Sequence, residues 1–574
     1  MAFELSSARP QSNISWVDLA VFAGIGALIY GLVSVAQEWS GQLQTAAEID
    51  LSAKYLPLYA LYSLTRGVVA YVISFFFTMI YGYVAARVRG ADRVMIPVLD
   101  ILQSIPVLGF LPIILLSLIR LFPHRNFGLE LASVLTIFTG QVWNMTFSFY
   151  ASLKSVPENL ESVSRLAKLT WWQRFLRLDL SFAAPGLLWN SMISMAGGWF
   201  FLTVSEAMKI GDYEFRVPGV GSYMYMANKK HDAVAQVLGV LAMIGIIVFL
   251  DQLVWRPLVA WSQKFSDDES GARGGTHSWV WDWIRRSQLW SLALRLANRK
   301  DRRQIHAKAA QPRSSPPIYS RRSRYLQALL KWVVIIAALA GTAFAGTEYI
   351  HLLRSLTIKD WHLLSVSTVF TFARVIAAVT LASLWTIPVG VMIGRSARWS
   401  NRLQPVIQMV ASFPAPMIFP VVIGVIFALG GSLGIGSIFL LLLGTQWYVL
   451  FNVISGAGAI PRELWEVTKL QGLSKATTWK RLILPAIFPA LLTGWITAMG
   501  GAWNATIVAE YTTYNDRDIS TVGLGALITQ AADSKNFALL GAAVGIMSLT
   551  VVLINRLVWR PLSRQAQTRF GMDA

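Results

Sequence analysis

Twelve long apolar segments dominate the chain, and each is long enough to cross a lipid bilayer. They lie at 16–37, 64–86, 95–119, 128–152, 182–206, 236–255, 326–346, 368–394, 405–428, 435–457, 487–510 and 538–558. About 20 apolar residues in a helix span the hydrocarbon core, where only helices and closed barrels satisfy every backbone polar group. Charged residues make up 14% of the chain, against about 25% in soluble domains. We therefore expect an all-α polytopic membrane protein with about twelve transmembrane helices.

The distribution of Lys and Arg predicts the orientation of these helices. If the N-terminus is inside, the inner segments hold 35 Lys and Arg and the outer segments hold 11. Cytoplasmic loops of membrane proteins are enriched in these residues, so both termini are predicted to be cytoplasmic in a cell inner (plasma) membrane. The net charge of +20 is then mainly a topology signal, and we expect no nucleic-acid partner. We interpret the first segment as a retained helix, not a signal peptide.

The two halves of the chain repeat each other. With an offset of 308 residues, Arg66 falls on Arg374; beyond the outer loop at 121–127 the offset is 304, and Glu206 falls on Glu510. Six spans per repeat is an even number, so the repeats are predicted to be parallel and related by a pseudo-twofold axis along the membrane normal. Transporters with a path between two halves have this layout. The predicted units are residues 1–258 and 326–574.

Between the units lies a basic cytoplasmic linker, residues 259–325. Its tryptophans at 279, 281, 283 and 290 lie among arginines. This mixture is typical of an interfacial amphipathic helix that contacts lipid headgroups. A plain tether between the units is the alternative.

Two inner loops are much longer than the others, and they fall at the same place in each unit. We name 153–181 the first elbow and 458–486 the second elbow. In the second, Pro461 suits a first helical turn, Glu463 and Glu466 suit the positive end of the helix dipole, and Gly472 suits a helix stop. We expect two helices at an angle, exposing a ridge to a partner.

The second elbow resembles the EAA signature of ABC importer permeases: Glu466, five residues, Gly472, and later Leu484-Pro485. The turns Ile105-Pro106 and Phe413-Pro414 that open each third span point to the nitrate/sulfonate/taurine/bicarbonate group of these permeases. The resemblance covers both units, as in fused, duplicated permease components. It implies a permease subunit of an ATP-driven importer, with a small anion such as nitrate, a sulfonate or bicarbonate as cargo.

The same resemblance implies the partners. Each elbow would dock on one of two cytoplasmic ATPase subunits, and a substrate-binding protein outside the membrane would deliver cargo. The chain lacks the G-x-x-x-x-G-K-[ST] phosphate loop, so ATP and Mg are expected on the partner ATPase, and this chain is expected to bind no cofactor itself.

The first elbow departs from the signature. Ser162 stands at the Glu position and Lys168 at the Gly position, while Pro157, Glu158 and Glu161 lie nearby. We therefore expect the first elbow to be built differently. It would bind an ATPase less tightly than the second elbow does, or it would bind a different ATPase.

Six residues are candidates for the translocation path or its gate. Arg66, Arg374, Glu206 and Glu510 are charged residues in or at the ends of spans, where charge is costly; Trp199 and Trp503 lie beside paired glycines that permit close packing. Structural pairing of each Arg with a Glu, and ordinary packing of each Trp, are the alternatives. We expect no catalytic residue, no enzyme activity and no metal site, since the six His do not cluster and there is no Cys.

The competing interpretation is a major-facilitator-type secondary transporter, which also has two parallel six-span repeats. Such transporters lack a 29-residue elbow in each half, and this favours the ABC permease. A pull-down that recovers an ATPase would distinguish the two.

Overall fold

The computed structural model describes residues 30–31, 33–210, 213–265, 278, 280–281, 340–341, 343–344, 346–514 and 517–570. The first half forms α2 (Leu56–Arg87), α3 (Asp92–Ser104), α4 (Val107–Leu121), α5 (Phe127–Lys154), α6 (Glu158–Leu166), α7 (Trp171–Arg174), α8 (Leu180–Glu206), β1 (Ala207–Ile210), β2 (Tyr213–Arg216), α9 (Val220–Lys229), α10 (Ala233–Leu250) and α11 (Arg256–Ser262). The second half forms α15 (Ile358–Gly394), α16 (Ala397–Ala411), α17 (Phe419–Ala428), α18 (Leu433–Gly458), α19 (Arg462–Leu470), α20 (Lys475–Thr478), α21 (Leu484–Ala509), β3 (Tyr511–Tyr514), β4 (Arg517–Ser520), α22 (Leu524–Asp533), α23 (Phe537–Ile554) and α24 (Arg560–Phe570).

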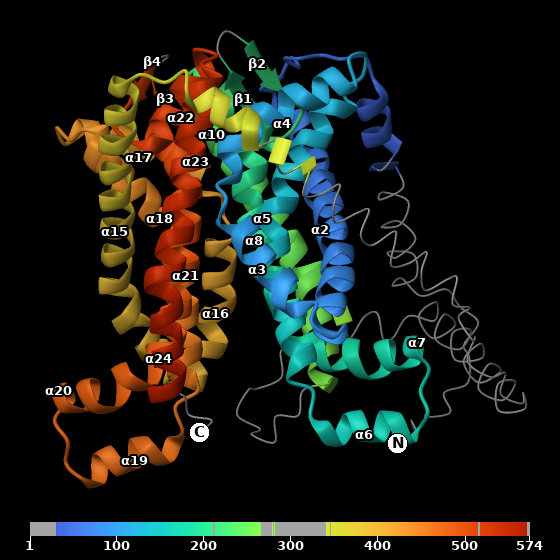
Figure 1. Ribbon diagram of the computed structural model, residues 1–574, viewed down its shortest axis with the longest axis vertical. Coiled ribbons are helices and arrows are strands. Elements are labelled where there is room, and N and C mark those ends of the chain that lie inside the picture. Colours follow the sequence, from blue (N-terminus) through green and yellow to red (C-terminus); the bar gives the residue numbers. More distant parts are fainter. Residues whose placement is uncertain are drawn as a thin grey trace, which may run out of the picture.

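Each half is a helical bundle built in the same order. The helix α5 packs between α2 and α8, and α18 packs between α15 and α21. Figure 1 shows the halves side by side, with α6, α7, α19 and α20 at one end and the β1–β2 and β3–β4 hairpins at the other. Both repeats therefore run in the same direction, as the sequence predicts.

Where the structure describes them, the predicted membrane spans are helical, apart from a break in the third span of each half. Among the residues that the structure describes, seven helical stretches are long and apolar enough to cross a membrane, or nine if two bent helix pairs each count as one span. The helix α5 covers the predicted span 128–152 but is not among them. The predicted spans 16–37 and 326–346 lie largely outside the described residues, as does most of the linker with its predicted interfacial helix. The polytopic helical class is confirmed, and the number twelve stays a prediction.

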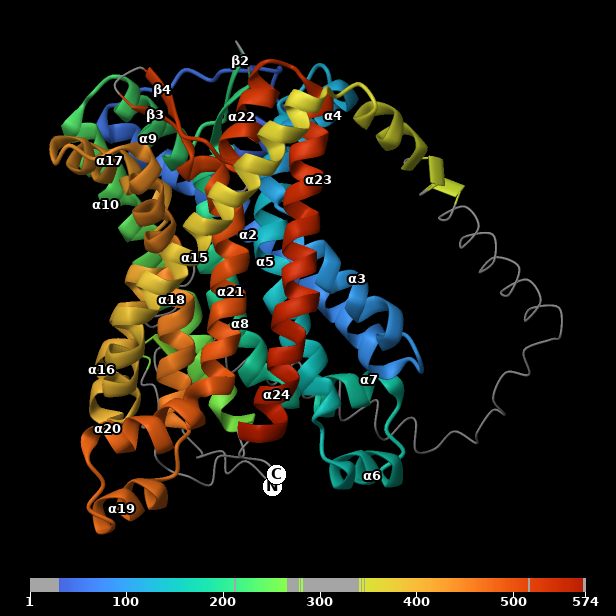
Figure 2. The same cartoon turned by 60° about the vertical axis from the view of Figure 1, so that its left-hand side comes forward.

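The third span of each half is broken, as its prolines predict. The helices α3 and α4 meet at 89°, and α16 meets the helix after it at 73°. Ile105 and Pro106 are extended at the first break, because a residue before proline is driven out of the helical region. The broken span then crosses to the other half: α4 contacts α21 and α22, and α3 contacts α23. Figure 2 shows α3 beside α23.

Several polar contacts join the halves. The amide N–H of Val107 donates to Oδ1 of Asn504 at 2.9 Å. Asn555 and Arg560 both donate to the carboxylate of Asp100. At the hairpin end, Lys209 in β1 pairs with Asp518 in β4 at 3.0 Å.

The two hairpins are a difference from the purely helical fold expected. Each is a two-stranded antiparallel pair, Ala207↔Arg216 to Ile210↔Tyr213 and Tyr511↔Ser520 to Tyr514↔Arg517. Four-residue strands are too short to give a clear alternation of polar and apolar residues, so the sequence pattern did not reveal them.

Candidate translocation path and coupling elbows

A buried Arg–Glu cluster lies where α21 ends. Arg374 Nη1 donates to Glu510 Oε1 at 2.9 Å, and the hydroxyl of Thr371 donates to the same carboxylate. The backbone N–H of Leu524 donates to Thr371 Oγ1, and that of Gly525 donates to Glu510 Oε2. The carboxylate thus holds α15, α21 and the start of α22 together.

The first half repeats this cluster with the equivalent residues. Arg66 Nη1 donates to Glu206 Oε1 at 2.8 Å, and Ser63 Oγ donates to the same oxygen at 2.6 Å. The N–H groups of Val220 and Gly221 donate to Ser63 and Glu206. Ser63 and Thr371 are equivalent in the repeat, each three residues before its Arg, and that equivalence is the sequence signal for both positions.

One acid distinguishes the two clusters. Arg66 also donates through Nε and Nη2 to the fully buried Glu130. The equivalent of Glu130 is Gly434, whose carbonyl accepts from Arg374 Nε at 3.3 Å. The first cluster thus pairs one cation with two carboxylates, and the second pairs one with one.

The structure shows the pairing alternative for these four charged residues. Arg66, Glu206 and Glu510 are fully buried and Arg374 is 7% exposed. None of the four lines the three cavities described below. A buried pair costs about 3–5 kcal/mol to break from one side, so these residues hold the helices together; a role in gating stays a prediction.

Trp199 and Trp503 are buried side chains at the walls of cavities. Trp199 lines a space of about 20 Å³ with Asp251 and Gln408, and its ring lies against Gly67. Trp503 stacks near Phe372 with ring centroids 6.4 Å apart and lines a larger cavity. Both tryptophans thus border cavities as well as packing against neighbours; their role in the translocation path or its gate stays a prediction.

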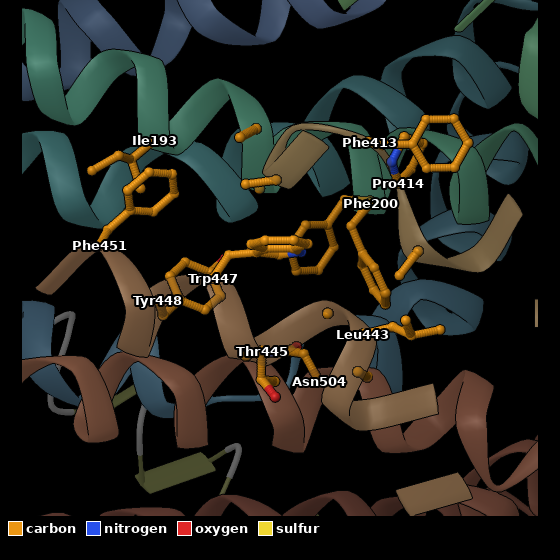
Figure 3. A pocket seen from close by; sticks show the side chains of 18 of the residues that line it. Ile193, Phe200, Phe413, Pro414, Leu443, Thr445, Trp447, Tyr448, Phe451 and Asn504 are labelled. Atoms are coloured by element: carbon orange, nitrogen blue, oxygen red, sulfur yellow. The ribbon is translucent and has the colours of Figure 1, made fainter. Parts of the chain in front are cut away.

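Two larger cavities lie between the halves. The first, here the aromatic cavity, has a volume of about 80 Å³, and Figure 3 shows the rings of Phe200, Phe413, Trp447, Tyr448 and Phe451 around it. The second, here the polar cavity, has a volume of about 160 Å³. Four residues line both cavities and separate them: Phe201, Tyr448, Gly501 and Asn504. These lining residues were not among the sequence candidates, because only the fold brings α8, α18 and α21 together.

The two elbows have the same construction. Each has a nine-residue helix, α6 or α19, after a proline at its N-cap, Pro157 or Pro461. Each turns through a left-handed residue, Lys168 with φ +48° or Gly472 with φ +60°. A hydroxyl residue then caps the second helix. The backbone of the first elbow is not built differently, because Lys168 adopts the conformation that glycine has in the second. The side chains that anchor the elbows do differ, as described next, and weaker binding of an ATPase by the first elbow stays a prediction.

The elbows differ in how the preceding span holds them. In the first, Arg87 at the end of α2 pairs with Glu161 at 2.5 Å and with the buried Asp179. In the second, the equivalent Arg395 lies over the ring of Trp465, 4.2 Å from its centroid. Burial of Glu161 raises its pKa, but the hydrogen bond and charge of Arg87 outweigh this and leave the pKa below its usual range. An ion-pair network thus anchors the first elbow to the preceding span, and a cation–π contact anchors the second elbow to its preceding span.

The remaining elbow candidates lie on or beside these helices. Glu158 opens α6, and Ser162 accepts a hydrogen bond from Arg165. Glu463 and Glu466 are on the exposed side of α19, while Leu484 and Pro485 open α21. Two leucines that the sequence analysis did not single out protrude most: Leu166 is 81% exposed and Leu470 is 87% exposed. Leu166 and Leu470 occupy equivalent positions in the repeat, and that equivalence is the sequence signal that could have identified them as a pair.

The fold and these sites define a duplicated membrane transport protein with paired elbows at one end. Residues 78–254 and 386–560 each match the family model of the binding-protein-dependent transport system inner membrane component. Together they cover more than half of the chain, and the chain therefore belongs to this family. As a transport permease family it accounts for the multi-pass architecture, and it does not support the major-facilitator alternative.

Relatives in the curated collection each match about one third of the chain. A putative ABC transporter permease protein of Methanocaldococcus jannaschii is 26% identical over 34% of this chain and 74% of its own length. A nitrate import permease protein of Synechocystis sp. is 24% identical over 34% of this chain and 67% of its own length. The taurine transport system permease protein of Escherichia coli is 24% identical over 32% of this chain and 63% of its own length. The chain is thus similar to permeases of ABC transporters.

Proposed function

We propose that this chain is the complete membrane path of an ATP-driven importer for an anion, with its two halves in the places of two permease subunits. The relatives include permeases named for nitrate, bicarbonate and taurine, and this supports an anionic cargo. The substrate-binding protein would dock at the hairpin end, and both termini would be cytoplasmic, as the distribution of Lys and Arg favours.

The observation that carries the proposal is the pair of elbows. Both extend from the same end of the molecule (Figures 1 and 2), and each presents a protruding leucine, Leu166 or Leu470. Val163 and Val467 are exposed on the same two helices, so each elbow presents an apolar group of residues, and grouped exposed apolar residues mark contact sites. One ATPase subunit would bind each elbow and hold ATP and Mg.

The test is a pull-down of the tagged full-length chain from its native membrane. We expect an ATPase at about two copies per chain, as two elbows require, reduced to about one by Leu166→Asp or Leu470→Asp and lost in the double variant. Leu429→Asp is the matched control, since Leu429 is 82% exposed at the end of α17 near the hairpins. Recovery of the chain alone, under conditions that keep a known transporter complex intact, would contradict the proposal.

A further inference from the structure

The aromatic and polar cavities occupy equivalent places in the two halves. Trp447, Gly444 and Gly197 of the aromatic cavity have the equivalents Trp143, Gly140 and Gly501, and all three of these line the polar cavity. The frame of the two cavities is therefore the same, and differences between them lie in the other side chains.

At five equivalent positions, the aromatic cavity has an apolar or phenolic side chain and the polar cavity has an amide or a hydroxyl. The pairs are Ala411 and Gln103, Ile193 and Thr497, Phe200 and Asn504, Leu443 and Thr139, and Tyr448 and Asn144. The difference has the same sign at every pair. The polar cavity thus holds more amides and hydroxyls than the aromatic cavity, although Asn504 and Tyr448 line both and rings line both.

Polar groups at the boundary are free to bind. In the part of the chain that the structure describes, the side-chain amide of Asn144 and the hydroxyl of Tyr448 have no hydrogen-bond partner. Thr497 donates to the carbonyl of Thr493, and its oxygen can still accept. A solute with a polar end and an apolar body finds amides and hydroxyls mainly in the polar cavity and rings in both cavities.

The absence of formal charge on the described cavity walls limits which solutes the cavities can bind. Among the described residues, none that lines the aromatic or the polar cavity carries a formal charge. A bare inorganic anion gains nothing from the rings and loses its hydration there. An oxyanion joined to an apolar body gains on both sides, because neutral amides and hydroxyls stabilise oxyanions and the rings bury the body. Ligand pockets usually measure about 300–1,000 Å³, so cavities of about 80 and 160 Å³ fit only a small molecule.

Resting on the proposed import function, we infer that the cargo is a small amphiphilic organic acid. Its ring or branched apolar body would lie among Phe200, Trp447 and Phe451, and its oxygen-bearing head would lie toward Asn144. The walls of the path then contribute to selectivity beside any substrate-binding protein.

The probe for this inference is radiolabelled benzenesulfonate, with nitrate as the competitor. The full-length chain is purified with its ATPase into lipid nanodiscs, and binding is measured by equilibrium dialysis. We expect saturable binding that an equal concentration of nitrate does not displace. Asn144→Leu removes a polar contact and should weaken binding about fivefold. Phe200→Ala removes a ring and should weaken it about tenfold or more.

Thr493→Ile is the matched control, one helical turn from Thr497 and outside both cavity walls. It should bind as the unmodified chain does, whereas Thr497→Ile should bind more weakly. Equal displacement by nitrate, or normal binding by Asn144→Leu and Phe200→Ala together, would overturn the inference. If the ATPase co-purifies while benzenesulfonate fails to bind, the cargo inference fails alone; if no ATPase is recovered, the proposed function fails.

Discussion

Lys168 and Gly472 have the same left-handed backbone conformation, with φ +48° and +60°, at the same turn of the two elbows. Glycine adopts this conformation readily, whereas a residue with a Cβ is strained there by about 1–2 kcal/mol. The first elbow therefore keeps the shape of the second at an energetic cost. Any difference in how the elbows bind an ATPase must come from their side chains and their anchoring, not from their path.

Lys168→Gly should stabilise the first elbow by about 1 kcal/mol, because it relieves the left-handed strain. Hydrogen exchange of the full-length chain should show slower exchange over α6. Arg165→Gly, three residues earlier inside α6, is the control; it should speed exchange, since glycine costs about 1 kcal/mol in a helix. Faster exchange in the Lys168→Gly variant would show that the lysine side chain, not backbone strain, governs this turn.

Gly525→Ala should strongly destabilise the second half. A Cβ on Gly525 would lie 2.3 Å from the backbone oxygen of Thr506, while a Cβ on Gly500 meets nothing within 4 Å. We expect Gly525→Ala to cost about 1–3 kcal/mol, lowering the melting temperature in detergent. Gly500→Ala, within α21, should leave it unchanged or raise it, because alanine favours a helix. Equal melting temperatures would mean that α22 is not held as close to α21 as described.

Arg87→Ala should loosen its elbow more than Arg395→Ala loosens the other. Among the described residues, removing Arg87 leaves Arg174, at 3.7 Å, as the remaining cation paired with the fully buried Asp179, and a buried charge without a close partner is costly. Removing Arg395 deletes one cation–π contact, which contributes about 0.5–1 kcal/mol at exposed sites.

The mobility of each elbow can be measured with a spin label. The chain contains no cysteine, so one introduced cysteine is a unique site for the label. Labels at Leu166→Cys and Leu470→Cys report the mobility of each elbow. Arg87→Ala should raise mobility at position 166, and Arg395→Ala should change position 470 by less. Equal changes would show that the ion-pair network adds nothing over the cation–π contact.

Span length, repeat offset and proline position predicted much of the fold, because each has a direct local cause. The break after Ile105 follows from the chemistry of Pro106 alone, and the two elbows follow from loop length. The hairpins and the cavities were not predicted. Tyr448 of α18 and Asn144 of α5 line one cavity because the two halves pack against each other, and such long-range packing leaves no periodic signal. Comparing Glu130 with Gly434 across the repeat was possible, but without the fold nothing indicated that Arg66 faces that position.

The two elbows should respond differently to acid. The pKa of Glu161 is lowered in the folded protein from an ordinary value of 4.5, so its ion pair with Arg87 contributes fully above that value. The contribution is lost as the pH falls through the lowered pKa, because a protonated carboxyl no longer pairs with Arg87. The contact of Arg395 with Trp465 contains no acid that titrates. A spin label at Leu166→Cys should therefore become more mobile as a solution is taken from neutral pH to below that lowered pKa, while one at Leu470→Cys should change less.

Glu161→Gln is the control, since it removes the titrating group; its elbow should already be mobile at neutral pH and should respond less to acid. An acid response of the same size in the Glu161→Gln variant would place the titration at another group.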